Sequence, residues 1–188
     1  VFGVPLEEVT PYMRSKAKTV NFGIIYGISD FGLAKQLGVS RAEAAQYIDS
    51  YFARYTGVKE YMEREKQKAR DLGYVETLFG RRRYLPDIHA SNFNKRSFAE
   101  RTAINTPIQG TAADIIKIAM LQVEKKLQEA GVKSRVLLQV HDELVLEVTQ
   151  DEAEQVGKLV KETMEQAVKL QVPLVADVAT GTNWALAK

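Results

Sequence analysis

Apolar and polar positions in the first 72 residues repeat with the period of α-helices. Thr10, which stands before a proline, predicts the N-cap of a helix over residues 11–27. Ser40, with a glutamate three residues later, predicts the start of a longer helix over residues 41–55. After a Thr-Gly break, a further helix is expected over residues 58–72. The first part of the chain is therefore predicted to be helical.

The middle of the chain changes from helical to strand-like patterns and back. Two short β-type runs, residues 74–78 and 82–85, predict a small hairpin. A helix is expected from Asn94 to residue 130, with an interruption at Pro107, because proline lacks the N–H that an interior helical position needs.

The last third predicts a second hairpin with helical packing around it. In residues 135–148, two β-branched apolar runs flank a three-residue polar break, His141-Asp142-Glu143. A helix with Asp151 as N-cap is expected over residues 151–170, and a last strand over residues 172–178. Because no glycine-rich crossovers join these elements, the sequence predicts an α+β fold with a small antiparallel sheet.

Charge and aromatic content divide the chain into two parts. Residues 1–92 contain 14 Lys and Arg against 11 Asp and Glu, whereas residues 93–188 contain 12 against 13. All eight tyrosines and five of the seven phenylalanines lie in the first part. We expect two domains, 1–92 and 93–188, with different roles, although two differently composed cores would give the same counts.

Some classes of site and location are excluded or disfavoured by composition. The chain contains no cysteine, which excludes disulfides and thiolate metal sites and favours a reducing compartment. No apolar run approaches the length of a membrane span, and no signal-peptide pattern opens the sequence. We therefore expect a cytoplasmic protein without membrane contact.

Four side chains recur at every fourth position of the first predicted helix: Arg14, Lys18, Phe22 and Tyr26. On a helix they form one stripe, with two cations followed by two aromatic rings. At 1.5 Å per residue the stripe is about 18 Å long, the scale of an extended nucleoside triphosphate. Cations suit phosphate oxygens, and ring faces suit a sugar and a base. An amphipathic helix with solvated cations and buried rings is the other interpretation.

Basic and amide side chains gather in the first predicted hairpin and in the segment that follows it. A phosphate backbone could follow the cluster, although an ordinary basic loop would have the same composition. The cluster contains Arg81, Arg82, Arg83, Lys95, Arg96 and Arg101. Arg101 also shares a four-residue spacing with Asn105 and Gln109, whose amides suit base edges in a minor groove.

The tip of the second predicted hairpin carries two adjacent carboxylates, Asp142 and Glu143, beside His141. Hard cations such as Mg²⁺ prefer oxygen ligands, and stiff strands would hold these ligands in place. The tip is thus a candidate magnesium site, with a solvated acidic turn as the alternative.

These motifs together resemble a known family. Arg14-x3-Lys18-x3-Phe22-x3-Tyr26-Gly27 and Gln139-Val140-His141-Asp142-Glu143 resemble motifs B and C of the family A DNA polymerases, the bacterial DNA polymerase I group. Glu100-Arg101-x3-Asn105-x3-Gln109-Gly110 resembles the segment between them. The resemblance covers nearly the whole chain, and it implies that residues 1–92 belong to the fingers and residues 93–188 to the C-terminal part of the palm.

The resemblance also implies a role for each residue in template-directed DNA synthesis. Arg14 and Lys18 would grip the triphosphate of an incoming dNTP, with Lys18 assisting catalysis. Phe22 would lie against the sugar, and Tyr26 and Gly27 would lie at the templating position.

Residues of the second part would hold the metal, and residues of both parts would contact primer–template DNA. Asp142 would ligate catalytic Mg²⁺, of which the complete enzyme uses two ions, with Glu143 in support. The remaining residues would contact primer–template DNA: Arg81, Arg82, Arg83, Arg101, Asn105, Gln109 and His141.

One family motif has no match in this sequence. Motif A, which supplies another metal-binding aspartate, and the thumb are expected upstream of Val1, so the chain by itself is expected to be inactive. A single-subunit RNA polymerase is an alternative, since it has a similar nucleotide helix and carboxylate hairpin. A non-catalytic DNA-binding module is another, because the pattern around Gly38 is typical of a helix-turn-helix.

Overall fold

The computed structural model describes residues 2 and 4–187. They form two compact units, one up to Ile108 and one from Gln109 onward. The division of the chain into fingers and palm at residues 92 and 93 stays a prediction. Helices and two small antiparallel sheets make up both units, so the predicted α+β class is confirmed.

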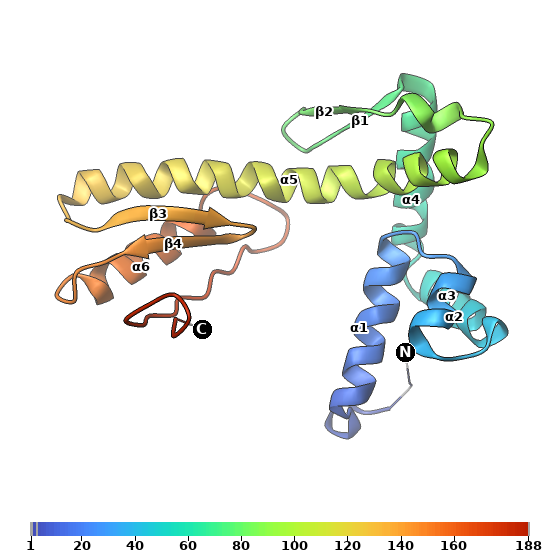
Figure 1. Ribbon diagram of the computed structural model, residues 1–188, viewed down its shortest axis with the longest axis horizontal. Helices are drawn as coiled ribbons and strands as arrows, with labels where there is room; N and C mark the ends of the chain where they lie inside the picture. The colour runs from blue at the N-terminus through green and yellow to red at the C-terminus, as the bar shows by residue number, and fades with distance from the viewer. Residues whose placement is uncertain (1, 3, 188) are drawn as a thin grey trace. The chain divides into compact units, whose positions relative to one another are not determined.

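Four α-helices and a short 3-10 helix build the first part of unit one, with α2 and α3 beside α1 (Figure 1). Their bounds are η1 Leu6–Glu8, α1 Pro11–Ile25, α2 Asp30–Leu37, α3 Arg41–Arg54 and α4 Thr56–Leu72. The predicted N-caps are confirmed, because the Thr10 hydroxyl accepts from the Met13 N–H and the Ser40 hydroxyl accepts from the Glu43 N–H. Each cap satisfies a backbone donor that the helix leaves open.

The break between α3 and α4 is shorter than predicted. Only Tyr55 leaves the helical conformation, with φ −114° and ψ 63°, and α4 starts at Thr56 rather than residue 58. Gly57 therefore lies in the first turn of α4, because a glycine near a helix start costs little when the following residues pack well.

A hydrophobic core joins the first three helices. Val20 and Ile24 of α1 pack with Leu33 and Leu37 of α2 and with Tyr51 of α3, all nearly inaccessible to solvent. The helix-turn-helix pattern thus has its apolar faces against α1.

The predicted hairpin after α4 is confirmed as β1 Tyr74–Glu76 and β2 Arg82–Tyr84, which pair antiparallel with Val75 opposite Arg83. The 3-10 helix η2 Pro86–His89 follows. Val75 is buried and packs with small and branched side chains from α4, η2 and the following helix. This second core fixes one face of the hairpin.

Helix α5 extends from Phe93 to Ala130 without a break, so the predicted interruption at Pro107 is wrong. Proline removes one helical hydrogen bond, to the carbonyl four residues earlier, and its ring crowds that turn. In the same turn, the Tyr61 hydroxyl of α4 donates to the Ile104 carbonyl at 2.8 Å.

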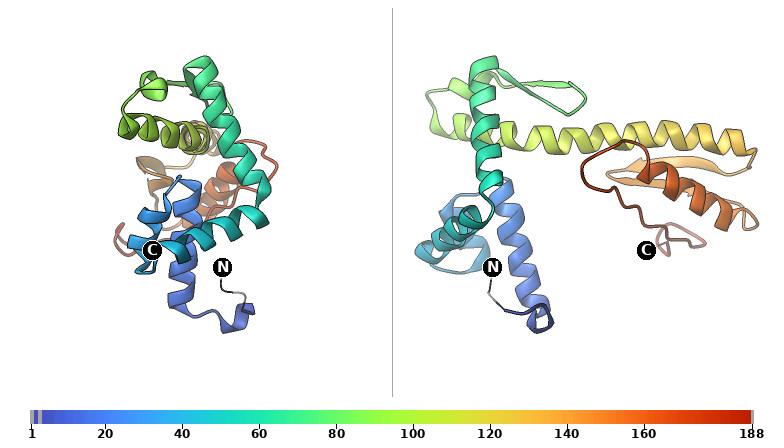
Figure 2. Two further views of the ribbon diagram at one scale, coloured as in Figure 1. Left: turned by 90° about the vertical axis from the view of Figure 1, so that its right-hand side faces the viewer. Right: turned by 180° about the vertical axis from the view of Figure 1, so that it is seen from behind.

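Unit two packs the second hairpin against helices. Strands β3 Arg135–Val140 and β4 Glu143–Glu147 pair antiparallel, with a bulge at Leu137. The sheet face with Val136, Leu144 and Leu146 packs on α5 and on α6, which lies beside the hairpin (Figure 1, Figure 2). The turn has two residues rather than the predicted three, because Glu143 already pairs with Val140.

Two further predictions in unit two are wrong. Helix α6 spans Ala153–Glu165, shorter than predicted at both ends, and its N-cap residue is Glu152 rather than Asp151. Residues 172–178 form no strand, because a strand needs a neighbouring edge and no other segment of residues 2 and 4–187 pairs with them. No helix in the described part of the chain is long and apolar enough to cross a membrane.

Candidate functional site

The four-residue stripe lies on the exposed side of α1. Val20 and Ile24 are buried, whereas Phe22 and Tyr26 remain 44% and 39% exposed. The interpretation of these rings as core residues is therefore wrong. Positions two apart on a helix lie roughly 200° apart around its axis, which explains how one helix carries both surfaces.

Neighbouring members of the stripe contact one another. The rings of Phe22 and Tyr26 stack, with centroids 6.2 Å apart and planes 18° apart. The Lys18 ammonium lies 5.9 Å from the centre of the Phe22 ring, within cation–π range. Within residues 2 and 4–187, no carboxylate pairs with Arg14 or Lys18. Two cations without carboxylate partners beside stacked rings can accept an anion with a planar group attached.

A cavity of about 1020 Å³ opens beside the aromatic end of the stripe. Side chains from α1 and from the start of α5 line it, including Lys18, Phe22, Tyr26, Asn94, Ser97 and Arg101. A cavity of this volume is large enough for a nucleotide. Its lining offers cations, hydroxyls, an amide and ring faces, which are the groups that bind phosphates, sugars and bases.

Arg101 is held against the end of α1. Its guanidinium donates to the Ser97 hydroxyl at 2.7 Å. Gly27 has φ +73°, and a Cβ there would lie 3.1 Å from the Arg101 Cγ. The backbone conformation therefore favours glycine, and a side chain here would also require the Arg101 side chain to shift slightly. Gly27 thus acts as packing for Arg101 as well as part of the predicted templating site.

The amide side chains of Asn105 and Gln109, which follow Arg101 at four-residue spacing, lie in different environments. The side-chain oxygen of Asn105 is buried and accepts no hydrogen bond from the described residues. A buried acceptor of this kind normally has a protein group or an ordered water as its partner. Gln109 is exposed and belongs to unit two. The structure therefore brings Arg14, Lys18, Phe22, Tyr26 and Arg101 into one unit but does not fix where Gln109 lies relative to them.

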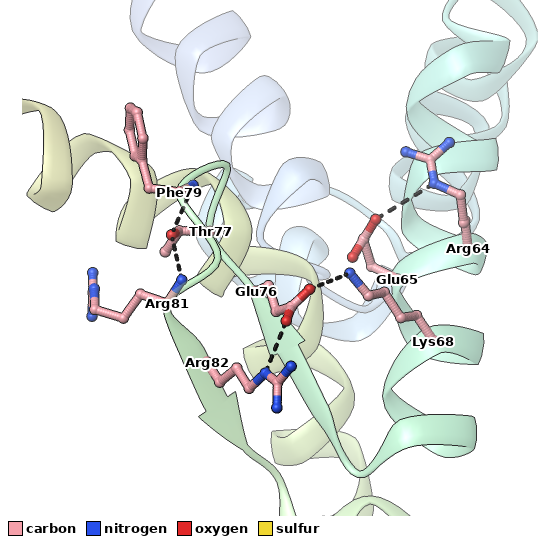
Figure 3. A network of polar contacts seen from close by, with 8 residues as sticks. All are labelled: Arg64, Glu65, Lys68, Glu76, Thr77, Phe79, Arg81 and Arg82. Carbon is pink, nitrogen blue, oxygen red and sulfur yellow. Dashed lines mark hydrogen bonds and ion pairs between the residues drawn. The ribbon is translucent and has the colours of Figure 1, made fainter. Parts of the chain in front are cut away.

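The three arginines of the first hairpin have different surroundings. Arg82 Nε donates to Glu76 at 3.0 Å, and its guanidinium stacks 4.5 Å from the Tyr74 ring centre. Glu76 also pairs with Lys68 of α4, as Figure 3 shows. The hydrogen bond from Arg82 lowers the pKa of Glu76 most strongly, with Lys68 adding to the effect. Arg82 therefore stabilises the hairpin, whereas Arg83 is exposed and makes no ion pair with any described residue.

The second hairpin presents its acidic residues at a braced turn. His141 has φ +53°, which is uncommon for a residue other than glycine. The Gln139 side chain donates to the His141 carbonyl at 2.6 Å and so holds this conformation. Asp142 and Glu143 follow directly, and both are exposed. The turn thus fixes the backbone from which two carboxylates project.

The acidic turn fits part of a magnesium site. Aspartate and glutamate oxygens are the hard donors that Mg²⁺ prefers, but the ion takes six ligands in octahedral geometry. Nowhere in residues 2 and 4–187 do three or more histidine, aspartate or glutamate side chains group as a metal site would need. Asp142 and Glu143 can therefore supply one side of a coordination shell.

Sequence reasoning missed three residues that hold the candidate site in shape: Tyr61, Ser97 and Gln139. Ser97 could have been found, since it lies four residues before Arg101 on the same helix. Gln139 lies within the quoted acidic motif but had no assigned role. Tyr61 lies 43 residues before its partner, and nothing local in the sequence indicates the contact.

The chain is similar to known proteins over nearly its whole length. The family model for DNA polymerase family A matches residues 1–186. The chain is 59% identical to the DNA polymerase I of Streptococcus pneumoniae over 189 residues and 60% identical to that of Pseudomonas aeruginosa over 184 residues. These alignments cover 100% and 98% of the chain but only 22% and 20% of the relatives. The chain thus spans about a fifth of the length of the curated relatives it matches.

A solved structure extends the similarity to three dimensions. The POL domain of Pol1 from M. smegmatis, in complex with DNA primer-template and dNTP, superposes with a TM-score of 0.95 at 47% identity. The match covers 99% of this chain and 33% of that one. With a family model over nearly its whole length and close relatives at this identity, the chain belongs to DNA polymerase family A.

Proposed function

We propose that this chain is part of a DNA-directed DNA polymerase, which transfers a nucleotide from a dNTP to a primer 3′-OH during DNA replication and repair. The observation that carries the proposal is the exposed stripe of α1, two cations without carboxylate partners and two stacked rings beside a cavity of about 1020 Å³. The solved relative in complex with primer-template and dNTP supports it.

The stripe orders the parts of an incoming nucleotide. Arg14 and Lys18 bind the triphosphate, Phe22 lies against the sugar, and Tyr26 stacks at the templating position. A protein catalyses phosphoryl transfer mainly in two ways, first by positioning the reactants and second by stabilising the charge that develops. Lys18 can supply the second, because its ammonium has no carboxylate partner in the described part of the chain and is available to charge that develops on the phosphate.

The acidic turn holds the metal ions in this proposal. Asp142 binds Mg²⁺ and Glu143 supports it, together with ligands from other segments of the polymerase. Bound Mg²⁺ would activate the primer hydroxyl and neutralise phosphate charge. The hydrogen bond to the His141 carbonyl fixes the backbone from which the Asp142 side chain projects. In this proposal the His141 side chain faces the primer terminus.

Primer–template DNA is held by polar residues of both units. Arg101 and Asn105 act from unit one, and Gln109 from unit two. In the first hairpin, Arg83 is the better candidate for a phosphate contact, because Arg82 already bonds Glu76. We assign residues 1–92 to the fingers and residues 93–188 to the palm, and we place the protein in the bacterial cytoplasm with the DNA.

The two alternatives have less support. The relatives are DNA polymerases, which disfavours an RNA polymerase. In the helix-turn-helix alternative, α2 and α3 would read a duplex, but their buried residues pack on α1.

Primer extension by the full-length protein tests the proposal. We expect Mg²⁺-dependent addition of deoxynucleotides and little addition of ribonucleotides. Asp142→Asn should abolish extension while primer–template binding persists, because the substitution removes a metal ligand and leaves the DNA contacts. Sequence-specific duplex binding without nucleotide addition would contradict the proposal.

A further inference from the structure

Tyr61 is a partly buried residue whose ring and hydroxyl make different contacts, the ring with the Arg64 guanidinium 5.6 Å from its centre. It lies on α4, and its hydroxyl donates to the backbone carbonyl of Ile104 on α5 at 2.8 Å. A tyrosine hydroxyl, with an ordinary pKa of about 10, is protonated at neutral pH, and burial raises the pKa of Tyr61 further, to about 12. Ile104 itself is 3% exposed. The contact is therefore a permanent donor from one helix to the backbone of another.

The accepting carbonyl lies in the turn that Pro107 weakens. Proline provides no N–H for the Ala103 carbonyl, and its ring crowds the preceding turn. Interior prolines usually kink a helix for this reason. Helix α5 nevertheless continues through Pro107, and the Tyr61 hydroxyl donates to the Ile104 carbonyl, next to the Ala103 carbonyl that lacks its helical donor.

This turn carries the polar residues of the candidate DNA surface. Arg101 lies one turn before Asn105, and Ile104 lies between them. The Ile104 side chain reaches Gly27, where a Cβ would be 3.9 Å from its Cδ1 and 3.1 Å from the Arg101 Cγ. The end of α1, the turn of α5 and Tyr61 of α4 are thus connected by direct contacts.

We propose that Tyr61 is a positioning residue for primer–template binding, whose hydroxyl fixes the turn of α5 that directs Arg101 and Asn105 toward DNA. The inference rests on the proposed polymerase function. Tyr61 itself need not touch DNA or nucleotide. It acts through the Ile104 carbonyl, so its effect on DNA binding should depend on the residues that this turn presents.

The first test compares two tyrosine-to-phenylalanine variants in the full-length protein. Tyr61→Phe keeps the ring and removes the hydroxyl, and Tyr55→Phe does the same at an exposed position where α4 begins. We expect Tyr61→Phe to raise the Kd for a primer–template duplex roughly three- to tenfold, as for the loss of one hydrogen bond. Tyr55→Phe should leave it unchanged. An unchanged Kd in Tyr61→Phe overturns the proposal.

Double-mutant cycles separate positioning from a general structural role. In an Arg101→Ala, Asn105→Ala background, Tyr61→Phe should change the Kd by less than about twofold, because the residues it positions are absent. In a Pro107→Ala background its effect should also shrink, since the new N–H restores the missing helical bond. The same fold-change in all backgrounds would show that the hydroxyl acts elsewhere and would overturn the proposal.

Hydrogen exchange without DNA keeps the test independent of the proposed function. We expect faster exchange in Tyr61→Phe confined to amides near residues 103–108, reversed in the Pro107→Ala double variant. Loss of protection throughout the protein, or no local change, overturns the proposal. If the wild-type protein fails to bind primer–template, the polymerase function fails, while the exchange result still decides whether Tyr61 holds the turn.

Discussion

Two lysines of α1, two positions apart, have different surroundings. The Lys16 ammonium lies 4.7 Å from the Tyr12 ring centre, and a hydrogen bond with Tyr12 raises its pKa. Lys18 lies over Phe22 on the stripe and lines the cavity. The two residues share helix, charge and side-chain length. Lys16 is therefore a matched control for the role of Lys18.

Lys18→Ala in the full-length protein should slow nucleotide incorporation far more than it weakens DNA binding. Removing one preorganised group that stabilises transition-state charge costs about 10²- to 10³-fold in kcat. We expect the primer–template Kd to change by less than about threefold, because one phosphate contact among many contributes little. Single-turnover incorporation and DNA titration measure the two quantities. Equal effects of Lys16→Ala and Lys18→Ala would contradict the assignment.

Phe22 should control discrimination against dideoxynucleotides. Its ring offers no hydroxyl near the sugar, so the site depends on the 3′-OH of the nucleotide itself. Phe22→Tyr supplies a hydroxyl and should relax the discrimination, whereas Phe22→Leu, which removes the ring, should not. Competition between dideoxy and normal nucleotides measures the effect. An identical ratio in wild type and Phe22→Tyr would show that the ring lies elsewhere.

At the scale of elements, one carboxylate joins the start of β3 to the start of α6. The Glu152 oxygens accept from the Ser134 hydroxyl at 2.6 Å and from the Lys133 and Ser134 N–H groups at 3.0 to 3.1 Å. These hydrogen bonds lower the pKa of Glu152, and the bond from the Ser134 hydroxyl has the largest effect. The folded unit therefore favours the charged form, and Glu152 stabilises the packing of the second hairpin on α6.

The sign of this pKa shift predicts a pH dependence. A carboxyl whose folded pKa is lowered contributes stability above its unfolded pKa, about 4.3, and loses it as pH falls through the folded value. Glu152→Gln should therefore speed hydrogen exchange at residues 133–136 at pH 7. The difference in exchange rate between Glu152→Gln and wild type should become smaller below about pH 4.3. Glu154→Gln, in the first turn of the same helix, is the control, and a difference from wild type that does not change with pH would refute the linkage.

Local signals predicted most helix starts and the first hairpin. Thr10 and Ser40 each satisfy a donor three residues away, so a short window contains the whole interaction. At Pro107 of α5 the nearby contact comes instead from Tyr61, which lies 43 residues before its partner Ile104. The absent strand over residues 172–178 shows the same limit, because an apolar run becomes a strand only beside a partner edge.

The parts of the candidate site that depend on local spacing could be predicted from the sequence, and those that depend on strand pairing could not. The stripe consists of side chains that repeat every four residues along one helix. Its members, from Arg14 to Tyr26, could therefore be identified from the sequence alone. Arg82 contacts Glu76 and Tyr74. Charge alone could not distinguish this arginine from the neighbouring ones. Which arginines remain available depends on strand register, and register places Arg82 opposite Glu76 but Arg83 opposite Val75.

For the whole molecule, the proposed chemistry is distributed over two units. The nucleotide stripe and Arg101 lie in unit one, and Asp142 and Glu143 lie in unit two. The chain spans about a fifth of its relatives, and the described residues contain no group of three metal-binding side chains. The proposed reaction therefore needs metal ligands that residues 2 and 4–187 do not group together.

The isolated 188 residues should bind primer–template weakly and add no nucleotide. Mg²⁺ requires near-octahedral coordination and releases water reluctantly, so two carboxylates should bind it only weakly. A misplaced primer hydroxyl then costs orders of magnitude in rate. The residual DNA binding should come from basic residues such as Arg83 and Arg101, and it should fall steeply with salt. Primer extension with Mg²⁺ and four deoxynucleotides is the measurement, and extension that disappears in Asp142→Asn would show that this chain alone completes the metal site.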